Sequence, residues 1–513
     1  MGSKLGTTTN NDKWKSLILI FLFALAIRLW NFNAMGRTWD EASYVEVAYK
    51  YVQLIEEGNF TDRFWYIQSD HPPLARYIYA ALSSFDIQKK DEHGVPIYYY
   101  NYTFARLAST FLSCISIVLI FLLGNRFFSR FVGVVSGIVF AMNPFFLGFS
   151  HIATLEALIM ATYTGSMYFF LLFLDTNKQR YKLLTGVFLG LALLTKLTNF
   201  WIIVTFIMIY ILQLLKKPEK KEFIKKTQDL ISILCVALLM TIILWPMAWM
   251  HLDDIWAVQK TMRFSSHLSI PERFFGKLVL VPVFYYPIMF LITTPLMLLV
   301  LGFIGALRID KRRTIIGLGI LIWFVVPFFQ TFYHMRQHGI RYIIEVVAPF
   351  SLLAGIGLSY LVGNISKGFF VKVISLFIVT TYLFVELMMI TPYYIDYFNE
   401  VVGGNKNVYE KQLFQMGWWG EGIGEATYYI GSLEKKKVTV AIEGAQPEGV
   451  MPKLRNVQVV YYKKNTDADY VIVPYFNIVR LGFVEQELYQ KYHPIHSVYV
   501  GGAPFVKIYK KNE

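Results

Sequence analysis

Carboxylates gather at the ends of long apolar runs rather than inside them. They comprise Asp40, Glu41, Asp70, Glu156 and the pair Asp253 and Asp254. One lysine, Lys196, stands at a turn between two such runs with Thr and Asn neighbours. Side chains of these types can transfer protons and bind anions. Gathered at one interface, they favour chemistry on a lipid headgroup over passage through a bilayer.

The apolar runs that position these residues predict a membrane protein. The chain has 513 residues, of which 55% are hydrophobic and only 16% are charged. Runs of about 18–25 apolar residues are long enough to cross a hydrocarbon core of roughly 30 Å. We predict eleven spans, at 15–32, 103–123, 130–148, 154–174, 182–196, 198–215, 229–250, 281–305, 314–332, 342–362 and 371–391.

Lys and Arg residues occupy the loops on one side of these spans. The net charge of +14 includes six lysines between Lys216 and Lys226 and further cations at each alternate turn. This distribution follows the positive-inside rule, and it indicates orientation and anionic lipid rather than nucleic acid. We expect a multi-pass protein of the plasma membrane with a cytoplasmic N-terminus. The run from Leu17 to Trp30 lacks a small-residue cleavage site and is interpreted as an uncleaved anchor.

Three polar segments then lie outside the cell, at 33–102, 251–280 and from 392 onward. Apolar spacing of three and four predicts surface helices from Thr38 to Ile55, from Pro72 to Phe85 and over 253–266. Short β-type runs at 437–442, 457–462, 469–474 and 505–509, with a polar helix at 481–491, predict a small α/β domain. We therefore divide the chain into a transmembrane domain, 1–391, and an extracytoplasmic domain, 392–513.

An ordered series of motifs resembles the membrane glycosyltransferases of the C superfamily. The similarity is greatest to the protein O-mannosyltransferases and the bacterial lipid A aminoarabinose transferases. The residues that carry it are Asp40 and Glu41, His71 to Leu74 with Arg76, Arg106, Gly190 to Lys196, Tyr285 to Pro287, Thr294 to Leu296, His338 to Tyr342, Pro392 to Asn399, Gly403 and Gly404, and Trp418 to Gly422. Relatives often carry Arg or Asp near the outer start of the fourth span, where this chain has His151 and Glu156.

The resemblance implies transfer of a sugar from a polyprenyl-phosphate donor to an extracytoplasmic acceptor, with inversion. The acceptor can be a protein hydroxyl, a lipid or an envelope glycan, and the partners include the bilayer but no nucleic acid. Such a displacement needs one general base, for which Asp40 is the candidate with Glu41 in support. The leaving phosphate needs cations and hydrogen bonds. The substrate-binding candidates are His71, Arg76, Arg106, Glu156, Lys196, Arg263, Arg341 and Tyr342.

Several of these residues have simpler explanations. Asp40 can be the cap of its helix, with Thr38 and Glu41 forming a capping box. His71 can cap the second surface helix, and Lys196 can anchor a span at the interface. Arg106 fits a buried structural pair equally well.

Two other classes of function stay open from the sequence. A transporter or flippase of lipid-linked substrates would need a polar path through the spans, and a scaffold would bind partners through its C-terminal domain. No cofactor is expected. The histidines stand singly without ligand spacing, so no metal ligands are assigned, although the sequence leaves a divalent cation open.

Overall fold

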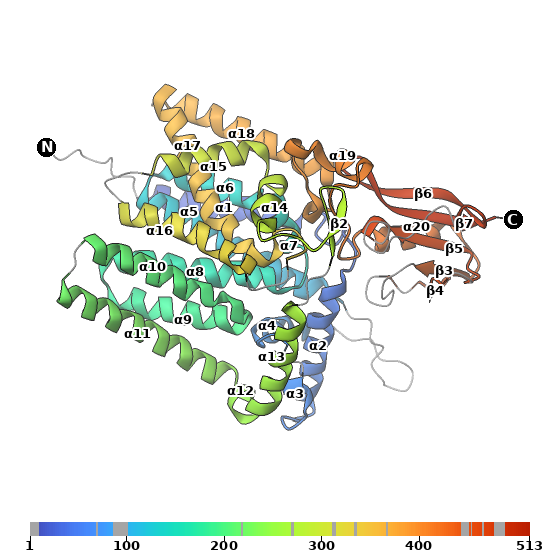
Figure 1. Cartoon of the computed structure of the whole chain (residues 1–513), viewed down its shortest axis with the longest axis horizontal. Helices are drawn as coiled ribbons and strands as arrows, with labels where there is room; N and C mark the ends of the chain where they lie inside the picture. The colour runs from blue at the N-terminus through green and yellow to red at the C-terminus, as the bar shows by residue number, and fades with distance from the viewer. Residues whose placement is uncertain are drawn as a thin grey trace.

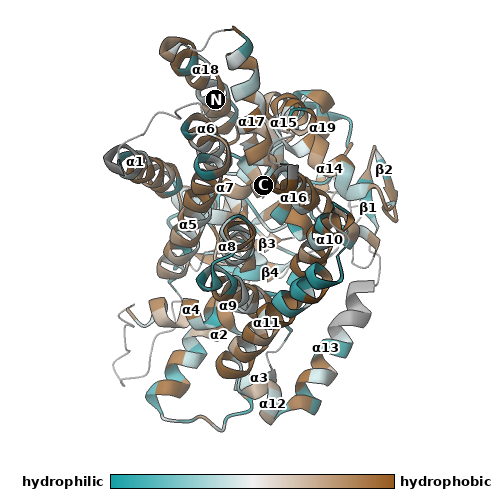
Figure 2. Ribbon diagram, turned by 90° about the vertical axis from the view of Figure 1, so that its left-hand side faces the viewer, coloured by the Kyte–Doolittle hydropathy of each residue, from teal (hydrophilic) through white to brown (hydrophobic). Residues whose placement is uncertain are grey.

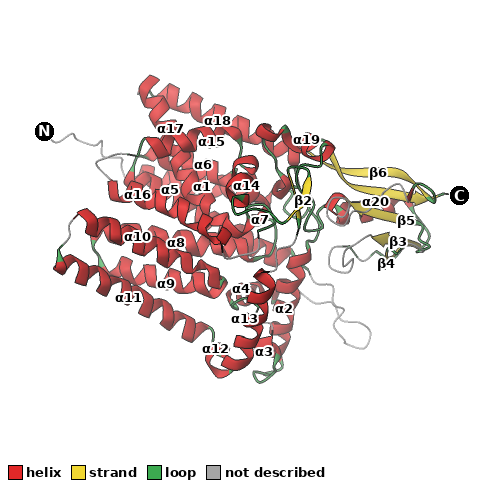
Figure 3. Cartoon of the chain, viewed as in Figure 1, coloured by secondary structure: helices red, strands yellow, loops and turns green. Residues whose placement is uncertain are grey.

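Long apolar helices lie side by side and form most of the molecule, with a small sheet at one end (Figure 1; Figure 3). The computed structural model describes residues 10–67, 70–85, 101–216, 219–267, 271–309, 314–332, 336–365, 368–442, 451–452, 454–463, 466–476 and 488–512. Figure 2 shows the bundle helices in hydrophobic colours over most of their length.

The bundle elements coincide with the predicted apolar segments. They are α1 (Asn10–Leu29), α5 (Thr103–Phe127), α6 (Arg130–Ala141), α7 (Pro144–Ser150), α8 (Leu155–Thr176), α9 (Gln179–Thr195), η1 (Leu197–Phe200), α10 (Trp201–Lys216), α11 (Lys220–Leu244), α14 (Tyr285–Thr293), α15 (Leu296–Leu307), α16 (Thr314–Val325), η3 (Val326–Phe332), η4 (Arg341–Val346), α17 (Val347–Ile365) and α18 (Phe369–Ile390). Among the described residues, seven helices are long and apolar enough to cross a membrane, or nine if each of two bent pairs is one span. The chain is thus a polytopic helical membrane protein, and the exact number of eleven spans stays a prediction.

The two bends fall where proline stops a helix. Helices α6 and α7 meet at 64°, and α14 and α15 meet at 116°. Pro144 follows the cap residue Asn143, whose side chain accepts a hydrogen bond from Phe146 N at 3.0 Å. Pro295 separates α14 from α15. Proline has no N–H for the helix ladder and fits the first turn of a new helix, so each bend begins a second segment.

The predicted surface helices form at the end of the bundle that carries the sheet. They are α2 (Trp39–Glu56), α4 (Leu74–Ser83) and α13 (Leu252–His267), with short α3 (Phe64–Ile67) and α12 (Met247–Met250). Helix α2 packs on α4, α4 packs on α5 and α9, and α13 packs on α3.

The C-terminal region contains a five-stranded sheet in the order β4-β3-β5-β7-β6. Its elements are η5 (Tyr394–Asp396), η6 (Glu400–Val402), α19 (Gly404–Glu410), α20 (Ile423–Leu433), β3 (Val438–Ile442), β4 (Val457–Tyr461), β5 (Tyr470–Pro474), β6 (Tyr492–Val500) and β7 (Ala503–Lys511). Strands β4, β3 and β5 are parallel, whereas β7 is antiparallel to both β5 and β6. Every residue of the central strand β5 is buried, as expected for a strand covered on both faces.

The four predicted strands are present, and the structure adds elements that the sequence did not indicate. They include β6, α19, α20 and a hairpin of β1 (Glu272–Phe274) and β2 (Lys277–Val279). Most of the predicted helix at 481–491 lies outside the described residues. Strand β6 contains two histidines and a proline, so its apolar alternation is weak.

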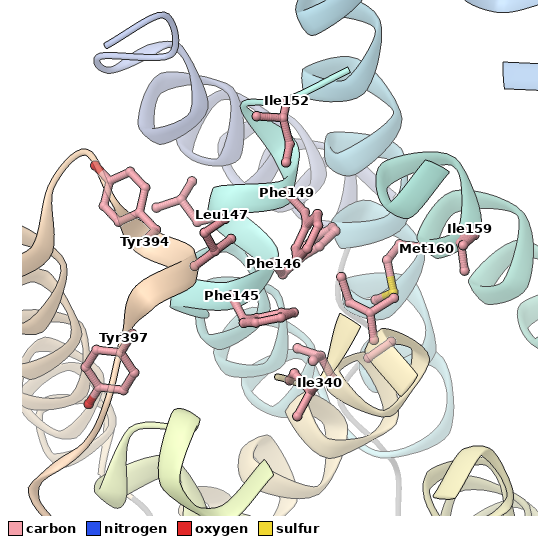
Figure 4. Close-up of a cluster of buried hydrophobic side chains, with 14 of the residues drawn as sticks. Phe145, Phe146, Leu147, Phe149, Ile152, Ile159, Met160, Ile340, Tyr394 and Tyr397 are labelled. Carbon is pink, nitrogen blue, oxygen red and sulfur yellow. The ribbon is translucent and has the colours of Figure 1, made fainter. Parts of the chain in front are cut away.

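The segment after α18 joins this region tightly to the bundle. Tyr394 and Tyr397 lie beside α7 (Figure 4), and Ile395 approaches Gly148 so closely that a Cβ there would lie 2.5 Å from its side chain. Asn399 Nδ2 donates to the carbonyls of Leu291 and Thr294, both at 2.7 Å. These bonds satisfy carbonyls that the bend between α14 and α15 leaves without helical partners.

Candidate active site

A cavity of about 670 Å³ opens among the surface helices and the ends of the bundle helices. Its polar lining residues are Asp40, Ser43, Tyr44, Asp70, His71, Glu156, Lys196, Thr198, Gln259, Lys260, Arg341 and Tyr342. Its apolar lining residues are Pro72, Leu155, Leu197, Phe200, Trp245, Ala248, Leu252, Ile255 and Trp256. Six of the ten predicted site residues therefore meet in one cavity.

Arg341 joins two carboxylates in this cavity. Its Nη2 lies 2.6 Å from Asp40 Oδ2, and its Nε donates to Glu156 Oε1 at 2.7 Å. The side chains of Arg341 and Glu156 are buried, whereas that of Asp40 is 39% exposed. Asp40 is consequently the carboxylate of this group that an incoming molecule can reach.

The turn before Arg341 is fixed by a second predicted motif. His338 and Gly339 have φ values of 58° and 59°, in the region that glycine adopts most easily. Gly339 N donates to Tyr285 Oη at 3.1 Å, and that hydroxyl donates to Glu272 Oε1 at 3.0 Å. Two motifs far apart in the sequence thus hold one another at the start of η4.

Asp40 lies in the first turn of α2 but is not its cap. The cap residue is Thr38, whose N–H donates to Glu41 Oε2 at 3.0 Å. The capping function suggested for Asp40 therefore belongs to Thr38 and Glu41, and the Asp40 side chain is left to face the cavity.

Glu41 points away from the cavity into a buried ion pair. Arg106 Nε donates to Glu41 Oε1 at 2.8 Å, and Arg106 Nη2 donates to Oε2 at 2.7 Å. Ala153 N adds a hydrogen bond of 2.9 Å to Oε1. Both side chains are almost fully buried. A carboxylate with this many partners fixes the start of α2 and is poorly placed to receive a proton from a substrate.

Arg76 also lies outside the cavity lining and supports its wall. Its guanidinium pairs with Asp70 and donates to the carbonyl of His71 at 3.2 Å. Burial, followed by the positive charges of Lys196, Arg76 and Arg341, lowers the pKa of His71 to about 4 despite the opposing effect of Asp70. His71 therefore lines the cavity as a neutral hydrogen-bonding group at pH 7.

Lys196 brings a second cation to the cavity. It follows the last residue of α9, with only 9% of the residue exposed, and its Nζ lies 4.6 Å from the centre of the Tyr342 ring. A cation over an aromatic face is favoured when both are withdrawn from water. The side chain of Arg263 lies outside the described part of the structure.

Large apolar side chains form one side of the cavity and continue onto the surface. Phe200, Leu252 and Trp256 line the cavity and are exposed by 43%, 63% and 62%. Nearby Trp249 and Met250 of α12 are exposed by 60% and 56%. Exposed apolar residues that adjoin a cavity indicate contact with lipid or an apolar ligand.

Sequence reasoning did not single out Tyr44, Trp245 or Gln259 as lining residues. Tyr44 lies one helical turn after Asp40 on α2, a spacing that places both side chains on one face. Trp245 and Gln259 come from a different part of the chain, and no local pattern links them to Asp40.

Comparisons with known proteins find a family model and several solved structures that are similar to this chain. Residues 18–254 match the family model for dolichyl-phosphate-mannose-protein mannosyltransferase. None of the curated proteins matches the chain.

Among solved structures, ArnT from Cupriavidus metallidurans bound to undecaprenyl phosphate is 12% identical, with a TM-score of 0.55 over 96% of this chain and 97% of that chain. The two chains therefore share the same overall fold. The resemblance to the membrane glycosyltransferases of the C superfamily is confirmed.

Two further structures align less completely with this chain. The Archaeoglobus fulgidus oligosaccharyltransferase is 15% identical with a TM-score of 0.50, and the alignment covers 85% of this chain and 63% of that chain. The S. cerevisiae protein O-mannosyltransferase Pmt1-Pmt2 complex, bound to the sugar donor, is 19% identical, but its TM-score is 0.37 over 49% of this chain and 35% of that chain. The present chain thus spans about a third of the yeast protein and under two thirds of the archaeal one.

Proposed function

We propose that this protein is a glycosyltransferase, which moves a sugar from a polyprenyl-phosphate donor to an extracytoplasmic acceptor by a single inverting displacement. The observation that carries the proposal is the contact between Asp40 and Arg341 in a cavity with an apolar, exposed rim. A carboxylate and a cation in one cavity can act on the attacking group and on the leaving group of a single displacement. Asp40 would face the attacking hydroxyl, and Arg341 would face the leaving phosphate.

Asp40 would act as the general base. The acceptor hydroxyl attacks the anomeric carbon and passes its proton to a free oxygen of Asp40, while the bond from that carbon to the phosphate oxygen breaks. The phosphate leaves as an anion and needs no proton, so one carboxylate is sufficient. The partial exposure of Asp40 supports this role because a base must meet the incoming acceptor.

Arg341 and Lys196 would hold the phosphate, with Tyr342 beside them. The hydrogen bonds among the described residues use Nε and Nη2 of Arg341, which leaves Nη1 for a ligand. Negative charge accumulates on the phosphate as the bond breaks, so cations aimed at it stabilise the transition state more than the bound donor. Glu156 would orient Arg341, and neutral His71 would donate a hydrogen bond.

The exposed apolar rim would receive the start of the polyprenyl tail. Phe200, Leu252 and Trp256 stand where a lipid-borne donor would enter from the bilayer. This placement supports an outward orientation of the cavity and of residues 392–513 at the plasma membrane, with the N-terminus in the cytoplasm. The reaction is the same for any sugar carried on a polyprenyl phosphate and for any acceptor hydroxyl. Protein hydroxyls, lipids and glycans are therefore all to be tested as acceptors.

The test is incubation of purified protein in detergent with radiolabelled polyprenyl-phosphate hexoses and pentoses and a panel of peptide, lipid and glycan acceptors. Transfer of label by the wild type, and its loss in Arg341→Gln, is the expected result. If Arg341→Gln released polyprenyl phosphate from the donor as fast as the wild type, the assignment of the phosphate site would be refuted. Movement of the intact donor across reconstituted vesicles without transfer would replace the enzyme with a flippase.

A further inference from the structure

A loop from the C-terminal region lies directly on the turn that carries Arg341. This loop, residues 417–422, contains Trp418 and Trp419 in succession. The Trp418 ring stacks on His338 with centroids 4.5 Å apart and nearly parallel planes. The Trp419 ring lies over the Arg341 guanidinium, whose central carbon is 4.1 Å from the ring centroid.

Trp419 also contacts the helix that carries Asp40. Its carbonyl accepts a hydrogen bond of 3.2 Å from Trp39 N, in the residue immediately before Asp40. One residue therefore contacts Arg341 through its side chain and the neighbour of Asp40 through its backbone. The ring is 2% exposed and packs edge-on against Phe149 of α7, so its position is set from both sides.

Two buried carboxyl groups hold the loop in this conformation. Gly417 N donates to Asp396 Oδ1 at 2.8 Å, and Trp419 N donates to Glu421 Oε2 at 2.7 Å. Gly417 and Gly422 have φ values of 68° and 78°, which side chains with a Cβ rarely adopt. The conformation of the loop thus follows from its own residues and from a segment adjacent to α7.

The geometry divides the surface of Arg341 between its partners. The edge of the guanidinium carries the bonds to Asp40 and Glu156, and the indole of Trp419 covers one face. An indole on this face excludes water and strengthens the attraction between the cation and the ring. The plane of the guanidinium, and with it the direction of Nη1, is fixed by these contacts together.

We propose that Trp419 is a positioning residue of the active site, through which the C-terminal region fixes Arg341 against Asp40 for phosphate binding. The inference rests on the proposed function. It makes residues 417–422 part of the machinery for transfer.

The experiment is a double-mutant cycle between Trp419→Ala and Arg341→Lys, measured as kcat/KM for transfer and as affinity for a polyprenyl phosphate in detergent micelles. In the wild-type background, we expect Trp419→Ala to lower kcat/KM about 10- to 30-fold, the loss expected for a desolvated cation–π contact. On Arg341→Lys, the same change should cost less than about 3-fold, because residues that act through one another are not additive. Trp419→Phe, which keeps an aromatic face, should restore activity to within about 3-fold of the wild type.

Tyr509→Ala is the matched control because Tyr509 is a fully buried aromatic residue in a separate cluster of the sheet. It should lower the melting temperature yet leave kcat/KM per folded protein unchanged. Equal losses from Trp419→Ala in both backgrounds would reduce Trp419 to a structural residue, and no loss in either background would refute the proposal.

Binding separates this proposal from the function on which it rests. If the wild type binds polyprenyl phosphate but transfers no sugar, the proposed reaction fails, and the cycle in affinity still decides the role of Trp419. If the wild type binds no polyprenyl phosphate, both proposals are refuted.

Discussion

Replacing Asp40 with asparagine separates the role of a base from that of a partner to Arg341. The amide is almost the same size as the carboxylate but cannot accept the proton of an acceptor hydroxyl. We expect kcat to fall by about 10²- to 10⁴-fold, the usual contribution of a general base. The fold should survive, because an ion pair whose carboxylate is 39% exposed contributes at most about 1 kcal/mol.

The affinity of Asp40→Asn for the donor should not fall with kcat. In the wild type, Asp40 contacts Arg341 Nη2 at 2.6 Å, so its negative charge lies close to a phosphate bound at Nη1 of the same guanidinium and repels it. The asparagine variant removes this repulsion, and its KM for the donor should be unchanged or lower. A fall in kcat without a rise in KM is the signature of an interaction needed in the transition state.

The assay is steady-state transfer from a radiolabelled donor, with donor affinity and thermal unfolding measured on the same preparations. Glu56→Gln, at the exposed end of the same helix, is the matched control and should behave as the wild type. Transfer by Asp40→Asn at the wild-type rate would remove Asp40 from the role of base. A raised KM with unchanged kcat would assign it to donor binding instead.

Four more substitutions test the surrounding groups. Glu41→Gln should destabilise the protein by about 3–5 kcal/mol, because it leaves the buried Arg106 without its charge partner; thermal unfolding should show a lower midpoint than for Glu56→Gln, and an equal midpoint would contradict the buried pair. Lys196→Gln should weaken binding of polyprenyl phosphate about 10- to 100-fold, as for the loss of a charged hydrogen-bond donor. His71→Gln should weaken it less than about 3-fold, because the pKa of His71 is lowered to about 4 and the ring is already neutral at pH 7. Equal losses from these two variants at pH 7 would show that His71 binds as a cation. Burial raises the pKa of Asp396 from 3.8 to about 7, so the folded state binds one more proton than the unfolded state between these pH values. Stability should therefore fall as pH rises from about 4 to 7. Asp396→Asn should make the melting temperature less dependent on pH over that range, and an unchanged slope would assign the titration to another group.

The membrane architecture was predictable from the sequence because it depends on local composition. A run of apolar residues long enough to cross a bilayer predicts a span whatever surrounds it, and each predicted segment coincides with a helix or a bent pair. The surface helix after Thr38 and the four β-type runs follow equally local patterns of spacing. Strand β6 was missed because its interruption by His493 and His496 leaves little alternation to detect.

The cavity was only partly predictable. The ordered motifs indicated Asp40, Lys196 and Arg341 as members of one site, and the structure brings them to a single cavity. Glu41 and Arg106 carry the same charges as the cavity residues, so the sequence alone could not separate a buried structural pair from a substrate contact. Tertiary packing decides whether such a side chain faces the cavity or the packed side of α2.

The chain of amino acids by itself determined where the long apolar segments lie, their order, the polar segments between them and the residue types available for transfer chemistry. These properties arise from hydrophobicity and spacing along the chain, which need no knowledge of distant contacts. The tertiary structure alone decided which carboxylate Arg341 meets, which cation Tyr342 covers and where Trp419 lies. The contacts of Arg341 with Trp419 and with Asp40 join residues 78 and 301 positions apart in the chain. The geometry of all these contacts is fixed by the packing of whole helices and of the C-terminal region against them.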